Sequence, residues 1–262
     1  MTIDNILLEM EGFFHSLHTV IEKPEYIKIS NRNVFRYKSK TVNIAMIQLM
    51  ARIISGLNSA NLLIKNGLIQ ESNVLYRTLD EFQENITFLS KALLDDNITE
   101  LHQRFLDNFF EEEFDNVDNA FHSTQKRDLI PRDKIRAFIA NIDENPVNPS
   151  DTQKTLETVD KFYSGFVHGT STHIIDMYSD NPSKYSVCGL SEESPSVIVA
   201  QRDFEEYLYR SIFSMLTIAL SFGETAIYEK IASLRYEFER QTGKDDYECP
   251  VKAMNKMKRK GK

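Results

Sequence analysis

The chain is poor in the residues that mark disulfide-rich, metal-binding or loop-rich proteins. Its 262 residues include only 2 Cys, 9 Gly and 7 Pro, and no Trp. The two cysteines, Cys188 and Cys249, cannot form a disulfide framework, and neither lies in a paired metal-ligand spacing. A chain of this length buries enough surface to fold without cross-links. Since it neither needs disulfides nor has the cysteines for a framework of them, we expect a protein of the reducing cytoplasm.

Long apolar runs and export signals are also lacking. The first residues carry acids where a signal peptide has a basic start. The run 212–222 is about half as long as a membrane span. The segment 42–64 contains Arg52 and several amide side chains, which are costly in lipid. We therefore expect no membrane partner.

The common cofactor and nucleophile motifs are absent as well. The sequence has no GxGxxG, no GxxxxGKS/T, no HExxH and no GxSxG. These absences argue against dinucleotide enzymes, P-loop nucleotidases, zincins and α/β-hydrolases. We expect no cofactor.

Acidic residues outnumber basic ones over the chain as a whole, but the C-terminal segment is basic. The net charge is −8, and residues 252–262 hold six Lys or Arg and no acid. Such an end is typical of a solubilising tail; the alternative is a tether to nucleic acid or another acidic surface. The acidic body argues against broad binding of a phosphate backbone. We expect a single helical domain over 1–242 and a basic tail over 243–262.

Apolar periodicity predicts mostly helices, since all seven prolines fall between periodic segments. The predicted helices cover about 3–22, 41–66, 70–94, 98–122, 131–142, 151–178 and 203–241. We expect a loop over 23–39 and a linker over 143–150. The β-prone runs KYSVCGL and PSVIVAQ predict a small hairpin or two extended strands. The expected fold is an all-α bundle of six to eight helices with a small β-hairpin-like insertion near 184–200.

The predicted helix over 70–94 has a regular apolar seam, and Arg77 and Glu81 lie opposite it. Four residues apart, they form an ordinary surface ion pair if that face is exposed. If other helices cover the face, the pair belongs to a buried polar cluster. Burying such charges lowers stability unless each one is paired or takes part in a functional site.

The segment KFYSGFVHGTSTH, residues 161–173, concentrates polar residues and glycines. Helical spacing places Lys161, Ser164 and His168 on one face, and His173 on the opposite apolar seam. Two glycines within five residues, Gly165 and Gly169, indicate a close approach by another helix or by a ligand. The alternative for His168 is an exposed or interface residue without chemistry.

The chain resembles a bacterial helical family catalogued as domain of unknown function five-six-seven-seven. The similarity covers about residues 40–240 and rests on an Arg-x-x-x-Glu element, an Arg-Phe pair and a Tyr-Ser-x-x-Val-His-Gly element. The matching positions are Arg77, Glu81, Arg104, Tyr163, Ser164, His168 and Gly169. The resemblance implies a helical fold and little biochemistry. On this basis we expect an interior polar cluster of Arg77, Glu81, Arg104 and His168, in a protein that acts by self-association or partner binding.

The chain is more distantly similar to HEPN domains, helical bundles found in ribonuclease toxins and defence proteins. Their site pairs an Arg with a His on one helix near a dimer interface; here Lys161 replaces the Arg, and Lys lacks the bidentate fork of Arg. The similarity implies a metal-independent ribonuclease acting as a homodimer. His168 would be the general base and Lys161 would stabilise phosphate charge, with Tyr163 or Ser164 orienting either group.

Two weaker patterns contain groups that bind transition metals. One is Glu11 with His15 and His18 along one side of the first helix. The other joins histidines to the acids Glu111, Glu112 and Asp115. Spacings of three and four are common by chance, and charged helix runs are usually solvated faces. We therefore assign no metal site.

Overall fold

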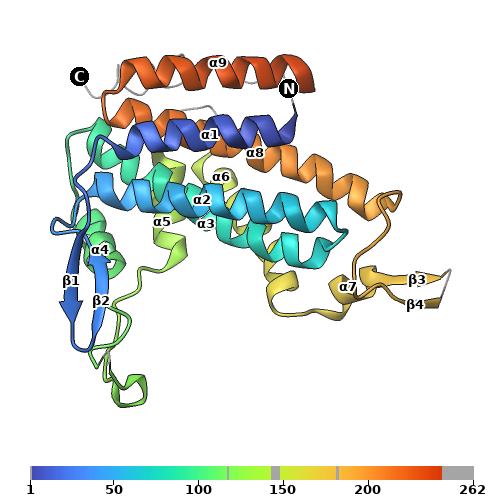
Figure 1. Cartoon of the computed structure of the whole chain (residues 1–262), viewed down its shortest axis with the longest axis horizontal. Coiled ribbons are helices and arrows are strands. Elements are labelled where there is room, and N and C mark those ends of the chain that lie inside the picture. Colours follow the sequence, from blue (N-terminus) through green and yellow to red (C-terminus); the bar gives the residue numbers. More distant parts are fainter. Residues whose placement is uncertain (1, 117, 143–147, 181–182, 244–262) are drawn as a thin grey trace.

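The computed structural model describes residues 2–116, 118–142, 148–180 and 183–243. Over these residues the chain forms an all-α, multi-helix bundle with small antiparallel β-hairpins, which confirms the expected fold class (Figure 1). Its helices are α1 (Ile3–His18), α2 (Val42–Lys65), α3 (Ile69–Leu94), α4 (Glu100–Phe109), α5 (Arg132–Ile142), α6 (Pro149–Val167), α7 (Ser171–Ile174), α8 (Pro195–Ser221) and α9 (Thr225–Thr242), with short 3-10 turns at Ala120–His122 and Ile175–Met177.

Helix α2 lies at the centre of the bundle. It is apolar on most of its circumference, and it packs against α1, α3 and α8. Met46, Met50, Ile53 and Leu57 are fully buried along it. Among the described helices, α2 alone is long and apolar enough to cross a membrane, and half of that window is buried inside the bundle. This burial is what a central bundle helix requires.

Helix α3 begins and ends within one residue of its predicted bounds, and its two faces pack differently. The apolar seam, with Leu79, Ile86 and Leu89, faces the core beside α2. Helices α6 and α8 pack on α3 as well, so its polar side is covered. Arg77 and Glu81 are therefore not an open surface pair: their side chains are 20% and 35% exposed.

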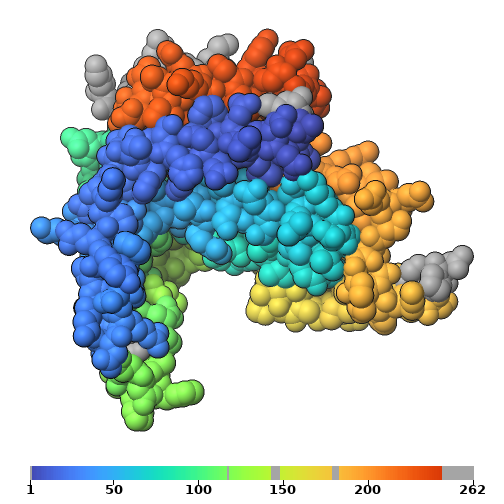
Figure 2. Space-filling view, in the orientation of Figure 1, coloured from blue at the N-terminus to red at the C-terminus, as the bar shows by residue number. Residues whose placement is uncertain are grey.

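The predicted loop over 23–39 is wrong in part, because it contains an antiparallel hairpin. Strand β1 (Glu25–Ile29) pairs with β2 (Arg32–Arg36). The predicted helix over 98–122 is too long: α4 ends at Phe109, where the Arg127 side chain donates to the Asn108 carbonyl at 2.7 Å and so satisfies a carbonyl of the last turn. The hairpin and the segment after α4 project together from one end of the bundle (Figures 1 and 2).

The predicted helix over 151–178 also ends early. Helix α6 stops at Val167, and Gly169 has a left-handed φ of 64°, a conformation that suits the end of a helix. The β insertion is smaller and earlier than expected, with β3 (Tyr178–Asp180) paired to β4 (Ser183–Tyr185). The run PSVIVAQ is the start of α8 because Pro195 occupies the first helical turn, where proline is well accepted.

The single helix predicted over 203–241 is two helices, α8 and α9, which pack against each other. The break is at Gly223, whose φ of 75° ends α8. Part of the predicted linker (143–147) and the tail over 244–262 lie outside the described residues.

Candidate functional site

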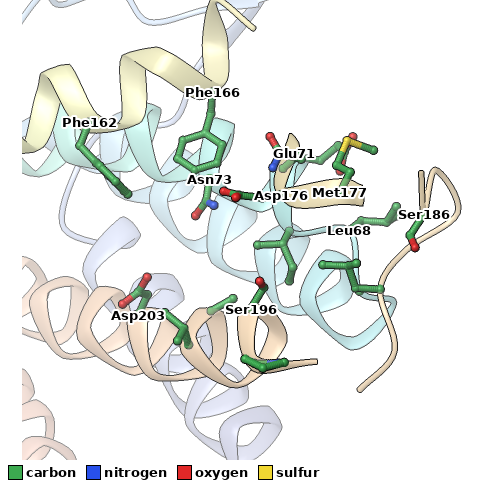
Figure 3. A pocket seen from close by; sticks show the side chains of 17 residues that line it. Leu68, Glu71, Asn73, Phe162, Phe166, Asp176, Met177, Ser186, Ser196 and Asp203 are labelled. Atoms are coloured by element: carbon green, nitrogen blue, oxygen red, sulfur yellow. The ribbon is translucent and has the colours of Figure 1, made fainter. Parts of the chain in front are cut away.

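A pocket of about 280 Å³ lies at the end of the bundle where α3 and α8 begin and α6 ends (Figure 3). Phe162 and Phe166 of α6 form one side, Ser196 and Asp203 of α8 form the other, and Asn73 of α3 lies between them. Most of the remaining wall is apolar, from Leu68, Ile69, Met177, Leu190, Val199 and Ala200. The pocket is thus apolar in its walls, with a few polar groups that converge on it.

Two glycines allow the chain to close one wall of the pocket. The loop before α8 crosses the α2–α3 turn, where Leu190 N–H donates to the Gly67 carbonyl at 2.9 Å. A Cβ on Gly67 would collide with the Leu190 backbone, and one on Gly189 would collide with the Asn66 carbonyl. Both glycines also have positive φ, 69° and 110°. These positions therefore require glycine for the loop to lie on the turn.

A third glycine positions α7 beside the pocket. The imidazole of His173 lies so close to Gly165 that a Cβ there would collide with the ring. That ring packs on Phe166 with centroids 3.9 Å apart, and the Gln70 side chain donates to the His173 carbonyl at 2.7 Å. The close approach predicted from the glycines is made by α7, and it holds α7 against α6 and α3.

Asn73 is the most unusual polar group of the pocket. It is 8% exposed, it lines the pocket, and it forms no hydrogen bond within the described part of the chain. Its amide projects into the space between α6 and α8 (Figure 3). The amide N and O are accessible from the pocket, since they are not among the fully enclosed side-chain atoms of the described residues that lack a partner. An amide oriented in this way is ready to donate to and accept from a ligand.

Three carboxylates, Glu71, Asp176 and Asp203, also line the pocket. Glu71 and Asp176 are exposed and Asp203 is half-buried, and none of the three has an ion-pair or hydrogen-bond partner among the described residues. Burial, together with the nearby Glu206, raises the pKa of Asp203 above its ordinary value. No Lys, Arg or His is found among the described residues that line the pocket. The site therefore has a surplus of negative charge.

Next to the pocket, the bundle interior contains a chain of ion pairs. Asp160 of α6 binds Arg77 of α3 at 2.7 Å and Arg136 of α5 at 2.8 Å. Arg136 and Arg132 both reach Glu84. Each of these charges has an opposite partner, which is the condition for burying charge without a large penalty. The network joins α3, α5 and α6 through paired charges.

A second part of the network surrounds Asp80. Its carboxylate accepts a hydrogen bond from the Tyr207 hydroxyl at 2.8 Å and pairs with Arg210 at 2.7 Å. Burial raises the pKa of Asp80, against the opposing effects of Arg210 and Tyr207. The rings of Tyr76 and Tyr207 stack with centroids 4.1 Å apart, and Tyr163 packs edge-on to both. This buried tyrosine cluster packs α3, α6 and α8 against one another.

The expected interior cluster is partly wrong. Arg77 and Glu81 do meet, at 2.5 Å, within the interior network. Arg104 does not join them, because it lies on α4 and pairs with Asp128, whose side chain is 74% exposed. His168 does not join them either: it caps the end of α6 and is exposed to solvent.

The other residues proposed for catalysis differ in their exposure to solvent. Lys161 is exposed and Ser164 is half-buried. Tyr163 is only 8% exposed, and burial raises its pKa to about 12. A buried phenol with a raised pKa is poorly suited to exchange protons with an exposed His168. The HEPN-like ribonuclease stays a prediction.

No group of three or more His, Cys, Asp or Glu able to hold a metal ion is found in the described part of the chain. Glu11 lies 3.6 Å from His15 on the surface of α1. The acids after α4 have other partners: Glu112 accepts from Arg36 at 2.8 Å, and Asp115 accepts from Ser123 at 2.7 Å.

The pocket residues Asn73 and Asp203 were missed from the sequence, although one signal pointed to the first. Asn73, Arg77, Asp80 and Glu84 follow one another at spacings of four, three and four. This is a polar seam opposite the apolar one, and it places Asn73 on the covered face of α3. Asp203 has no comparable signal, because the α3 residues that share the pocket with it, such as Asn73, are more than a hundred residues away in the sequence.

Comparisons with protein-family models, with curated proteins and with solved structures found no match to this chain.

Proposed function

We propose that this chain is a ligand-binding helical-bundle protein and that the pocket between α6 and α8 is its binding site. The proposal develops the expectation of partner binding. Concave, mostly apolar pockets with a few converging polar groups are the usual form of ligand sites, at ~300–1,000 Å³. A pocket of about 280 Å³ is at the lower end of that range and fits a compact ligand.

The observation that carries the proposal is Asn73. The Asn73 side chain is 8% exposed and has no hydrogen-bond partner among the described residues, so its amide is left to water or to a ligand in the pocket. The amide lies in the wall of the pocket, where a ligand would satisfy both its donor and its acceptor. A polar group without a protein partner in the wall of a mostly apolar pocket is typical of ligand sites.

Asn73→Leu tests the proposal by separating stability from binding. Wild type and variant would be screened by thermal unfolding against compact amphipathic compounds. We expect the variant to be at least as stable as wild type without ligand. Ligands that raise the wild-type melting temperature, as binding to the folded state requires, should lose that effect in the variant.

Asn58→Leu is the matched control, because Asn58 is exposed on α2 and does not line the pocket. It should respond to ligands as wild type does. Compounds that stabilise wild type and Asn73→Leu equally would place binding elsewhere and contradict the proposal. A screen without any stabilising compound would contradict it as well.

Two other expectations remain separate proposals. The homodimer is tested by light scattering across a range of protein concentrations, and a monomer at every concentration would contradict it. The ribonuclease is tested by RNA integrity in the presence of chelator. Cleavage by wild type and none by His168→Ala would favour it, whereas intact RNA with both proteins would count against it.

A further inference from the structure

We infer that the pocket binds an organic cation, a compact molecule with an ammonium head and an apolar body. The inference rests on the proposed function and specifies the chemical class of its ligand. It follows from the charges, the walls and the helix ends that meet at this site.

The charges of the pocket call for a positive ligand. Glu71, Asp176 and Asp203 line it, and no Lys, Arg or His among the described lining residues balances their charge. Asp203 is half-buried, whereas Glu71 and Asp176 are exposed, so Asp203 is the least solvated of the three. In a partly desolvated site an ammonium group bound to a carboxylate forms a charge-assisted hydrogen bond, which is stronger than a neutral one.

Two features of the wall suit the same ligand. Phe162 and Phe166 present aromatic rings on the α6 side, and aromatic faces attract organic cations within about 6 Å. Leu68, Val199 and Ala200 offer apolar surface for the rest of the molecule. The Asn73 amide oxygen supplies a further acceptor for an ammonium N–H.

Helix ends at the pocket raise the opposite possibility, an anion. Helices α3 and α8 both begin there, and neither has a side-chain cap. Each helix N-terminus is equivalent to roughly half a positive charge. Three carboxylates outweigh two such half-charges, and Glu71 lies in the first turn of α3, where it offsets that terminus directly. The balance therefore favours a cation.

Calorimetry with three probes of one shape tests the charge preference: phenylbutylamine, phenylbutanol and phenylbutyrate, each titrated into the full chain at pH 7. We expect the amine to bind about tenfold more tightly than the alcohol, since it adds an ion pair to a partly buried carboxylate, and the acid to bind most weakly. Asp203→Asn should remove the preference for the amine over the alcohol, by weakening the binding of the amine. Glu205→Gln, on the same helix but outside the pocket lining, is the control and should change neither affinity.

The outcomes distinguish the inference from the proposed function. Equal binding of the three probes that is lost in Asn73→Leu would keep the pocket as a ligand site and overturn the cation. Tightest binding of phenylbutyrate would overturn it in favour of an anion at the helix ends. Binding of none of the probes, or binding insensitive to Asn73→Leu, would overturn both.

Discussion

At the residue scale, a glycine inside a helix shows whether another group packs closely against the backbone at that point. Gly165 lies in α6, where a glycine costs up to ~1 kcal/mol relative to alanine, and the cost is explained by the imidazole of His173 against its Cα. Gly12 in α1 has no atom within 4 Å of an added Cβ. The same residue type thus has opposite meanings at two helical positions.

Gly165→Ala should therefore lower stability, by about 1–3 kcal/mol, because the added methyl group displaces the His173 ring from its place against Phe166. Urea unfolding measures the change. Gly12→Ala should stabilise the chain by up to ~1 kcal/mol. Removing the ring in the double variant Gly165→Ala/His173→Ala should recover part of the loss. Additive losses would show that the contact is not the cause.

Asp203 makes stability depend on pH. Its pKa is raised in the folded chain above the ordinary 3.8, first by burial and then by Glu206. The folded state therefore binds the proton more tightly than the unfolded state, and the free energy of unfolding falls as pH rises from about 3.8 through the raised value. Tyr76 and Tyr163, which face Asp203 from α3 and α6, do not titrate in that window.

Asp203→Asn should remove this dependence. We expect its melting temperature to equal that of wild type at pH 3.5 or below and to exceed it by about 1–3 °C at pH 7, the shift that a fraction of a kcal/mol gives in a chain of this size. Thermal unfolding across pH 3 to 8 measures the difference. A wild-type advantage that grows with pH would contradict the sign of the pKa shift.

At the scale of elements, the interior ion pairs fasten α6 to its neighbours. Asp160→Asn removes one charge that serves both Arg77 and Arg136, and the side chain of Arg136 is only 5% exposed. Breaking a buried pair costs about 3–5 kcal/mol. Because Arg136 keeps Glu84, we expect a loss near the lower end of that range, measured by urea unfolding.

Glu237→Gln provides the comparison, because it breaks an exposed pair with Arg240, whose side chain is 64% exposed. Such pairs contribute about 0–1 kcal/mol. Equal losses in the two variants would mean that the packing of α6 does not depend on its interior charges. A larger loss of stability in Asp160→Asn would show that the buried ion pairs stabilise the packing of α6 on its neighbours.

Helices with a regular apolar periodicity could be predicted from the sequence. Helix ends that depend on a single residue or on distant contacts could not. Helices α2, α3 and α5 begin and end close to their predicted bounds because an apolar seam runs through each. The division of α8 from α9 depends on Gly223 alone, within an apolar pattern that continues past it. The run after Ser194 is rich in valine, yet it is helical because Pro195 starts a helix whose face packs on α3.

The candidate site was less predictable than the fold for the same reason. Arg77 and Glu81 could be paired from their spacing, since both lie on one helix. Asn73 and Asp203 line the same pocket only because α3 and α8, far apart in sequence, begin at the same end of the bundle. His168 was favoured by a local motif, and the end of α6 at Val167 leaves it on the surface.

At the scale of the molecule, the bundle and its projecting hairpin should differ in their share of the stability. All positions of β1 and β2 except Ile29 and Val34 are exposed, and the hairpin is joined to the segment after α4 by the exposed pair Arg36–Glu112. A two-stranded hairpin by itself is marginally stable. The core is formed by helices such as α2, whose Leu57 is fully buried.

Replacing residues 25–36 by a short Gly–Ser linker should therefore leave the melting temperature within about 2 °C of wild type, because an exposed ion pair and solvated strands contribute little. Leu57→Ala, by contrast, should cost about 2–5 kcal/mol through the cavity it leaves in the core. Circular dichroism during thermal unfolding compares the two. If the hairpin deletion destabilised the chain as much as Leu57→Ala, the hairpin would belong to the cooperative core. A small effect would instead mean that the chain maintains this exposed projection for a purpose other than stability.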